Sequence, residues 1–350
     1  MENINLSLNG TPVTGRPGTT ILELAQQYGI YIPTLCYDPH LKPLGSCRVC
    51  VVENEATKQI LASCVTPIAP GMVINTQSPS VIEARRTVVE LLLANHPESC
   101  LTSEDGNRCQ LKRIATELGI EKPRFSPMRH YYPIEDANPF IERDLNKCIL
   151  CGKCIRGCNE LMEIGAIDYA HRGFNAIPAT SLEVPLEKSP CQFCGLCVSL
   201  CPTEALTEKM RKNEGPAEKR VRSVCPFCGC GCGINLEVKG EKVIGVSADG
   251  ESPVNDICLC VKGRFGYDFI NSPDRLSKPL VKRNGVLEEA NWAEALNLVA
   301  RRLLETKEKS GPDSIAVLSS AKCTNEENYL LQKFARAVIG TNNVDHCARL

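Results

Sequence analysis

Cysteine is the residue type in this sequence with the widest range of chemistry. The 350-residue chain contains 22 cysteines, and most stand in tight groups in which two residues separate one cysteine from the next. Disulfide scaffolds are usually small secreted domains, whereas this chain is long and its first residues, 1–5, resemble no export signal. We therefore expect reduced thiols that bind metal, in a cytoplasmic protein.

Two runs of four cysteines repeat one spacing, with two, two and three intervening residues. Zinc sites use two separated pairs, whereas runs of this kind wrap [4Fe–4S] clusters, and the fourth cysteine of each run binds the other cluster. The first run ends in Cys158-Asn159, a departure from the Cys-Pro ending that Cys201-Pro202 keeps. The predicted ligand sets are Cys148, Cys151, Cys154 and Cys201 for one cluster, and Cys191, Cys194, Cys197 and Cys158 for the other.

Four earlier cysteines, with ten, two and thirteen intervening residues, predict a [2Fe–2S] site: Cys36, Cys47, Cys50 and Cys64. The alternative is four unrelated buried cysteines. Gly45 and Ser46 precede Cys47, as expected where backbone amides approach cluster sulfurs. The arrangement resembles the N-terminal β-grasp ferredoxin domain of the large complex I subunit, iron-only hydrogenases and NAD-linked formate dehydrogenases.

In those families the next segment holds a further [4Fe–4S] cluster through one histidine and three cysteines, in the pattern H-x3-C-x2-C-x5-C. His96, Cys100 and Cys109 match that pattern, but Ser103 stands at its middle cysteine. Three alternatives stay open: a cluster with serine or open ligation, a degenerate empty site, or an ordinary loop. We expect a labile or absent cluster, because a serine alkoxide ligates iron poorly.

A further group has a different spacing and consists of Cys225, Cys228, Cys232 and Cys260. It resembles the [4Fe–4S] domain of molybdenum or tungsten bis-pterin oxidoreductases, in which a lysine two residues after the last cysteine lies between cluster and pterin. The resemblance gives Lys262 that catalytic and cofactor-binding role, and the alternative is a surface lysine. Cys230 and Cys258 are expected to be bystanders.

Taken in order, these blocks resemble the catalytic subunit of bis-pterin formate dehydrogenases. The segments that most specifically resemble this family are residues 319–328 and 344–350. In the family, the residue that follows the second segment is the selenocysteine or cysteine metal ligand. We expect either an in-frame UGA read as selenocysteine, a fragment or a true terminus at Leu350. The resemblance implies formate oxidation to carbon dioxide or the reverse, with a molybdenum or tungsten bis-pterin guanine dinucleotide only in a longer form. This chain alone is expected to be inactive on formate.

The resemblance also implies partners that receive the electrons, namely a flavin/NAD subunit, a ferredoxin or a hydrogenase. Alternative functions are a stand-alone multi-cluster electron carrier and a complex I large-subunit-like component of an NADH oxidoreductase. An iron-only hydrogenase would share residues 1–208 but would lack the group that begins at Cys225. The complete double run counts against the complex I subunit, which generally lacks it.

The elements that position these cysteines indicate a multidomain α+β protein. We expect a hairpin turn at Asn9-Gly10, helices over residues 21–25 and 80–95, and a hairpin over 234–246. Helices should begin after Asn291, with Glu294 completing a capping box, and after Thr324 with Glu327, and residues 314–319 should form a buried strand. We expect the start of a doubly wound layer there.

The predicted domains follow the cysteine groups. They are a β-grasp [2Fe–2S] ferredoxin domain over 1–78, a degenerate His/Cys segment over 79–118, a two-[4Fe–4S] ferredoxin domain over 139–208, the [4Fe–4S] domain of molybdopterin oxidoreductases over 218–275, and the start of a pterin-binding α/β domain over 276–350. With 40 basic and 41 acidic residues, we expect no nucleic-acid partner, and the apolar runs are too short for a membrane span.

Overall fold

The computed structural model describes residues 3–98, 109–126, 130–212 and 214–346. The chain forms two compact units, residues 1–215 and 216–350. The first unit contains the three N-terminal cysteine groups, and the second contains the group that begins at Cys225.

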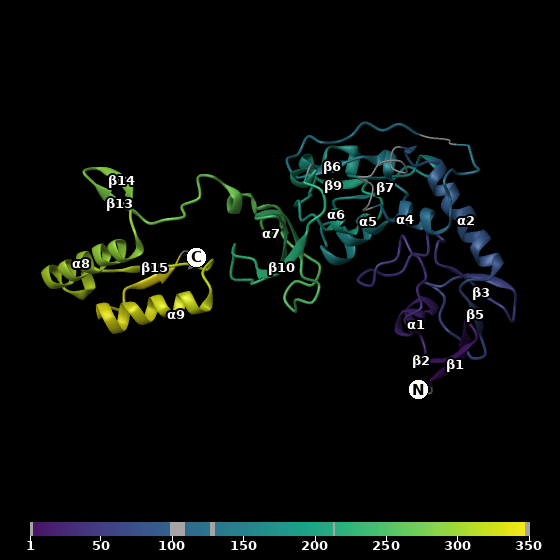
Figure 1. The fold of residues 1–350 in the computed structure, drawn as a ribbon, viewed down its shortest axis with the longest axis horizontal. Coiled ribbons are helices and arrows are strands. Elements are labelled where there is room, and N and C mark those ends of the chain that lie inside the picture. Colours follow the sequence, from purple (N-terminus) through teal and green to yellow (C-terminus); the bar gives the residue numbers. More distant parts are fainter. Residues whose placement is uncertain (1–2, 99–108, 127–129, 213, 347–350) are drawn as a thin grey trace. The chain divides into compact units, whose positions relative to one another are not determined.

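A five-stranded mixed sheet opens the first unit (Figure 1). Its strand order is β2-β1-β5-β3-β4, and β1 pairs with β5 in parallel while the other pairs are antiparallel. Asn9 and Gly10 join the first two strands with φ angles of 52° and 79°, which confirms the expected hairpin turn. The strands are β1 (Ile4–Leu8), β2 (Thr11–Gly15), β3 (Val51–Asn54), β4 (Gln59–Ala62) and β5 (Val73–Asn75).

One helix, α1 (Ile21–Gln27), packs on this sheet. Thr20 and Glu23 form a reciprocal capping box at its N-terminus, so two amides that no helix carbonyl can accept are satisfied. Ile21, Leu22 and Leu24 are completely buried. The β-grasp expectation for this region therefore agrees with a single helix on a mixed sheet.

Two further helices form the link to the following cysteine runs. α2 (Pro79–Ala94) begins after the N-cap Ser78, which confirms the helix expected there, and α4 (Gln110–Glu117) follows Cys109. Leucines, isoleucines and valines of both helices share one buried cluster with four cysteines. The apolar members from the helices are Val89, Leu93, Leu111, Ile114 and Ala115.

The remainder of the first unit consists of short elements around two small helices. The two strand pairs are antiparallel, and Figure 1 shows them beside the helices. Gly157 allows the helix over Leu196–Leu200 to pack closely against the backbone at residue 157, because a Cβ on Gly157 would lie 2.5 Å from Leu200 Cδ1. The elements are β6 (Ile141–Arg143), α5 (Lys153–Arg156), β7 (Asp168–Ala170), β8 (Ile177–Ala179), α6 (Leu196–Leu200) and β9 (Leu206–Glu208).

The second unit begins with a three-stranded antiparallel sheet and the short helix α7 (Val261–Phe265). The expected hairpin over residues 234–246 is confirmed by the pairing of β11 with β12. Next come the pair β13 (Leu280–Arg283) and β14 (Val286–Glu289) and the helix α8 (Trp292–Ser310). The sheet strands are β10 (Lys219–Val224), β11 (Gly233–Lys239) and β12 (Lys242–Ala248).

The last elements are two parallel strands joined through a helix, as a doubly wound layer requires. β15 (Val317–Ser319) pairs with β16 (Val344–His346), and α9 (Asn325–Lys333) lies between them in the chain. Thr324 and Glu327 form the expected capping box of α9.

Two expectations for this region are wrong. The strand expected over residues 314–319 is not buried. Leu318 of β15 is 80% exposed, and in the described part of the chain only β16 pairs with β15. Asn291 caps α8 as expected, but the Glu294 carboxylate pairs with the Arg283 guanidinium and completes no capping box. A nearby guanidinium offers a charged hydrogen bond, which is stronger than one to a neutral amide.

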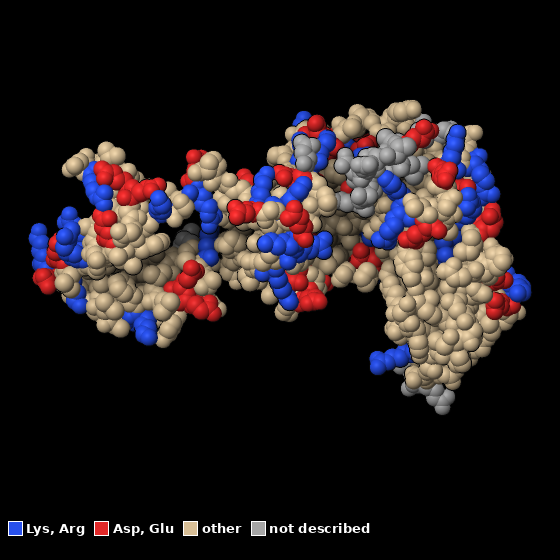
Figure 2. Space-filling model, viewed as in Figure 1, with Lys and Arg blue, Asp and Glu red and all other residues tan. Residues whose placement is uncertain are grey.

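Charged side chains of both signs are interspersed over the face drawn in Figure 2. This matches the near balance of 40 basic and 41 acidic residues. Among the helices that the structure describes, none is long and apolar enough to cross a membrane.

Candidate iron–sulfur sites

The four N-terminal cysteines lie together between the sheet and α2, and all four are buried. Their thiols interact directly: hydrogen bonds from Cys47 and Cys64 lower the pKa of Cys36, and one from Cys64 lowers the pKa of Cys50 to about 6. The same hydrogen bonds raise the pKa of Cys47 and Cys64. The backbone amide of Cys47 also donates to Cys36 Sγ over 3.5 Å. A buried set of four thiols with a backbone donor suits a [2Fe–2S] cluster, whose ligands must be thiolates.

The two repeated runs exchange their fourth cysteines in space. Cys148 and Cys151 both interact electrostatically with Cys201, so Cys201 of the second run lies with thiols of the first run. Cys154 interacts with all three and also with Cys197. Cys191 interacts with Cys194 and Cys158, and Cys197 interacts with these three and also with Cys201, so the two sets adjoin at Cys197 and Cys201. The structure thus brings together the two ligand sets that the spacing predicts.

The backbone repeats along with the sequence. The amide of Leu150 donates to Cys148 Sγ and that of Phe193 to Cys191 Sγ, each over 3.4 Å, and both donors have positive φ angles of 54° and 51°. Two residues later, Gly152 and Gly195 have φ angles of 70° and 72° and begin α5 and α6. Each turn aims an amide at a ligand sulfur, which stabilises a thiolate.

A cavity lies at the first of these thiol sets. Cys148, Cys151, Cys154 and Cys201 line it together with Cys197 of the other set and apolar side chains such as Ile155. Burial raises the pKa of Cys148 to about 11 and that of Cys151 to about 12. A raised pKa favours the protonated thiol, so a metal or cluster bound by these two residues would displace protons.

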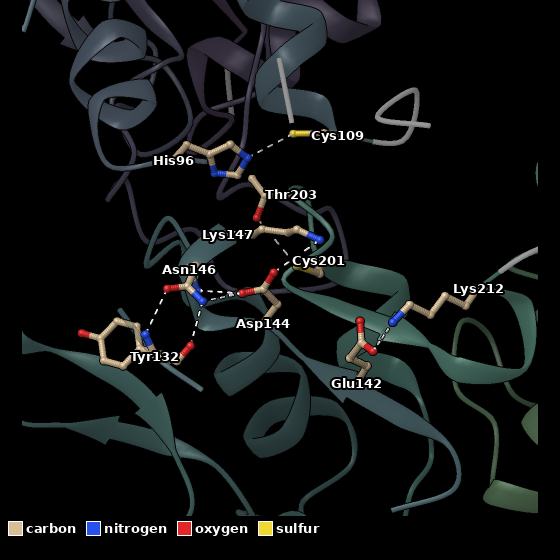
Figure 3. A network of polar contacts seen from close by, with 10 residues as sticks. All are labelled: His96, Cys109, Tyr132, Glu142, Asp144, Asn146, Lys147, Cys201, Thr203 and Lys212. Atoms are coloured by element: carbon tan, nitrogen blue, oxygen red, sulfur yellow. Dashed lines mark hydrogen bonds and ion pairs between the residues drawn. The ribbon is translucent and has the colours of Figure 1, made fainter. Parts of the chain in front are cut away.

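Of the degenerate His/Cys site, His96 and Cys109 are described, whereas Cys100 and Ser103 lie outside the described residues. Cys109 Sγ lies 4.0 Å from His96 Nε2, and both residues are buried. Figure 3 shows this pair beside Thr203 and Cys201, and the amide of Gln110 donates to Pro202 O over 2.7 Å. The half-site therefore adjoins a proposed ligand of the first ferredoxin cluster.

The group in the second unit is more open. Cys225 is buried, but Cys228 and Cys260 are exposed. Cys225 interacts with Cys228 and Cys260, and Cys232 with Cys225 and Cys228, so the four predicted ligands gather near the start of α7. Cys230, which was expected to be a bystander, also interacts with Cys225 and Cys232 and therefore lies close to the predicted ligands. Lys262 is exposed on α7.

In the described residues, no group of three or more His, Cys, Asp or Glu side chains is arranged to hold one metal ion. Ligands of a cluster bind different iron atoms, so they need not converge on one point. No disulfide joins the cysteines that the structure describes, and metal binding requires thiols that are not oxidised to disulfides.

Two buried residues beside the N-terminal site were missed by sequence reasoning. Arg85 of α2 is 3% exposed and Arg156 of α5 is 9% exposed. Both donate hydrogen bonds to carbonyls of the ligand loops. An arginine on a helix normally indicates a surface position, so the sequence carries no signal for them.

Five family matches cover most of the chain in order. They are a 2Fe-2S iron-sulfur cluster binding domain over residues 1–79, the NADH-ubiquinone oxidoreductase-G iron-sulfur binding region over 85–124, a 4Fe-4S dicluster domain over 147–205, the molybdopterin oxidoreductase Fe4S4 domain over 218–272, and the molybdopterin oxidoreductase family over 275–350.

Curated relatives match almost the whole chain. It is 39% identical over 349 residues to the "NADPH-Fe(3+) oxidoreductase subunit alpha" of Geobacter sulfurreducens, a match that covers 99% of this chain and 40% of the relative. It is 34% identical over 391 residues to the "Putative formate dehydrogenase SAR2393" of Staphylococcus aureus, a match that covers 99% of this chain and 39% of the relative. The chain thus spans about two fifths of the length of these relatives.

A solved structure also resembles the chain. It is one chain of the crystal structure of an NAD+-reducing [NiFe]-hydrogenase in the H2-reduced state, with a TM-score of 0.56 and 30% identity. The likeness covers 62% of this chain and 92% of that one.

Proposed function

We propose that this chain, which carries the iron–sulfur and pterin domains of the molybdopterin oxidoreductases in order, is the electron-transfer part of a formate dehydrogenase. Its membership of an oxidoreductase family rests on these domains. Formate as the substrate is our proposal, and the name of the Staphylococcus relative supports it.

The observation that carries the proposal is the parallel pairing of β15 with β16. Ser319 is the register partner of His346, so residues 319–328 leave the sheet at the edge where β16 ends. Ligands of parallel α/β sheets bind outside the carboxyl ends of the strands. The first of the segments that resemble formate dehydrogenases and the described residues of the second, 344–346, therefore meet at the edge where a substrate site is expected.

Asn328 fixes the first of these segments. Its side-chain amide donates to Ser320 O, Cys323 O and Thr324 O over 3.3, 3.3 and 3.1 Å, and its Oδ1 accepts a hydrogen bond from the Ser319 hydroxyl. One side chain thus ties the loop to its own strand, which preorganises the edge for a ligand.

We assign the four complete cysteine groups to one [2Fe–2S] and three [4Fe–4S] clusters, with His96, Cys100 and Cys109 holding a labile cluster or none. Bound clusters supply one-electron carriers. The chain's residues hold them through thiolates, donate amide hydrogen bonds to the sulfurs and keep water out by burial. Lys262, two residues after Cys260, is the residue that we place against the pterin.

We also propose partners that carry electrons onward, such as a flavin/NAD subunit, a ferredoxin or a hydrogenase. The likeness to one chain of a [NiFe]-hydrogenase supports this, because that enzyme reduces NAD+. A cytoplasmic location is proposed because reducing compartments keep cysteines free.

The test uses the native protein, isolated anaerobically from its source through a tag at residue 1. We expect molybdenum or tungsten in the preparation and formate-dependent reduction of a viologen dye. Lys262→Ala should lower that rate at least tenfold without loss of iron, whereas Lys282→Ala, an exposed lysine of β13, should leave it unchanged.

Two outcomes would contradict formate as the substrate. Iron and sulfide without molybdenum or tungsten would favour a stand-alone electron carrier. NADPH-dependent but not formate-dependent dye reduction would favour the activity in the name of the Geobacter relative.

A further inference from the structure

Two buried guanidinium groups contact the loops that carry the N-terminal cysteines. Arg85 belongs to α2 and Arg156 to α5, far apart in the sequence, and less than a tenth of either residue is exposed. The loops they contact contain three of the four proposed [2Fe–2S] ligands: Cys36, Cys47 and Cys50.

Arg85 holds the loop of the central pair of cysteines. Its Nε donates to Val49 O over 3.1 Å and its Nη2 to Val51 O over 2.9 Å. Val49 lies between Cys47 and Cys50, so this guanidinium fixes the backbone that spaces the two thiols. A third, longer contact of 3.4 Å joins Nη2 to Thr76 O.

Arg156 holds the loop that begins at the first cysteine. Its Nη2 donates to Cys36 O over 2.6 Å and its Nη1 to Lys42 O. The neighbouring Lys153 pairs with Asp38 over 3.3 Å. The helix that carries Cys154 is thereby bound to the loop that carries Cys36.

In the described part of the chain no carboxylate forms an ion pair with either arginine, although Glu117 attracts the Arg85 guanidinium from a longer distance. The hydrogen bonds that the structure gives them are with neutral carbonyls. Carbonyls satisfy hydrogen bonds but do not cancel a net charge, and burying an uncompensated charge is costly. An anion beside these loops would remove that cost.

We propose that Arg85 and Arg156 are positioning residues and buried counter-charges of the N-terminal cluster, which favour its reduced state. The proposal rests on the [2Fe–2S] assignment made above. Four thiolates outweigh the charge of the iron–sulfide core, and one-electron reduction adds a further negative charge. Buried cations therefore stabilise the reduced form more than the oxidised form and raise the reduction potential.

The experiment is an anaerobic redox titration of the chain, with the EPR signal of the reduced [2Fe–2S] cluster as the readout. Arg156→Gln and Arg85→Gln should each lower the reduced-to-oxidised ratio about tenfold at fixed potential, which corresponds to about 59 mV for one electron. Arg156→Lys keeps the positive charge, so its reduced-to-oxidised ratio should stay close to that of the wild type. Arg48→Gln removes an exposed arginine from the Cys47 loop and should change the ratio less than twofold, because solvent screens its charge.

Equal potentials in the wild type and both glutamine variants would overturn the proposal, as would a shift in Arg48→Gln as large as theirs. Loss of the signal in both glutamine variants but not in Arg156→Lys would support it, because the charge is then needed for assembly. A wild type without a [2Fe–2S] signal would refute the cluster assignment and this proposal together. Formate turnover plays no part in the readout, so a different substrate leaves the result interpretable.

Discussion

Cys201 and Cys158 each lie with the thiols of the other run. An exchange of this kind ties the two halves of the ferredoxin domain together, because each cluster needs residues from both. The loss of the fourth cysteine of one run should therefore disturb the cluster that the other run holds.

Cys201→Ala should expose the thiols of the first run rather than those of its own run. We expect faster alkylation of Cys148, Cys151 and Cys154 by iodoacetamide under anaerobic conditions, mapped by mass spectrometry, since cluster ligands are protected. The matched variant Cys158→Ala should give the reverse pattern, with Cys191, Cys194 and Cys197 labelled. Labelling of the mutated run itself in both variants would show that each run binds its own cluster.

Ser103→Cys should complete the ligand set with His96, Cys100 and Cys109. The change replaces a hydroxyl of very high pKa with a thiol that ligates iron readily, so the iron content should rise by about four atoms. The neighbouring Thr102 stands at no ligand position of the pattern, so Thr102→Cys is the control and should add no iron. An unchanged iron content in Ser103→Cys would show that the segment is an ordinary loop.

At the element scale, most caps and turns were predictable from local sequence. The Glu294 capping box was not, because its carboxylate pairs with Arg283, and neither was the coverage of strands. Thr20, Thr324 and the Asn9-Gly10 turn act through neighbours a few residues away, and the structure contains them. The exposure of Leu318 depends on which other layers cover β15, and the apolar pattern of residues 314–319 carries no information on that.

Thr20→Ala should weaken α1 locally. Removal of the hydroxyl leaves the Glu23 amide without its cap, which costs about 1 kcal/mol. Native-state hydrogen exchange of the α1 amides should detect a decrease of that size in their opening free energy. Thr57→Ala, at an exposed turn of the same domain, serves as the control, and an equal effect from it would refute a specific role for the cap.

At the scale of the whole molecule, the order of the sites could be inferred from cysteine spacing alone, and the family matches follow the same order. Thiolate spacing is a local property of a loop, so the sequence records it directly. The contacts of Arg85 and Arg156 join segments far apart in the chain, and no local pattern encodes them. The sequence predicted a β-grasp domain over residues 1–78, but it did not predict the order of the strands in the sheet.

The central claim is that this chain holds four clusters on four complete cysteine groups. The most direct test is the iron and acid-labile sulfide content of the anaerobically prepared chain, with EPR to distinguish cluster types. One [2Fe–2S] and three [4Fe–4S] clusters predict about 14 iron atoms per chain. About 18 would contradict our interpretation of Ser103, and zinc in place of iron, or fewer than about 10 iron atoms, would contradict the claim itself.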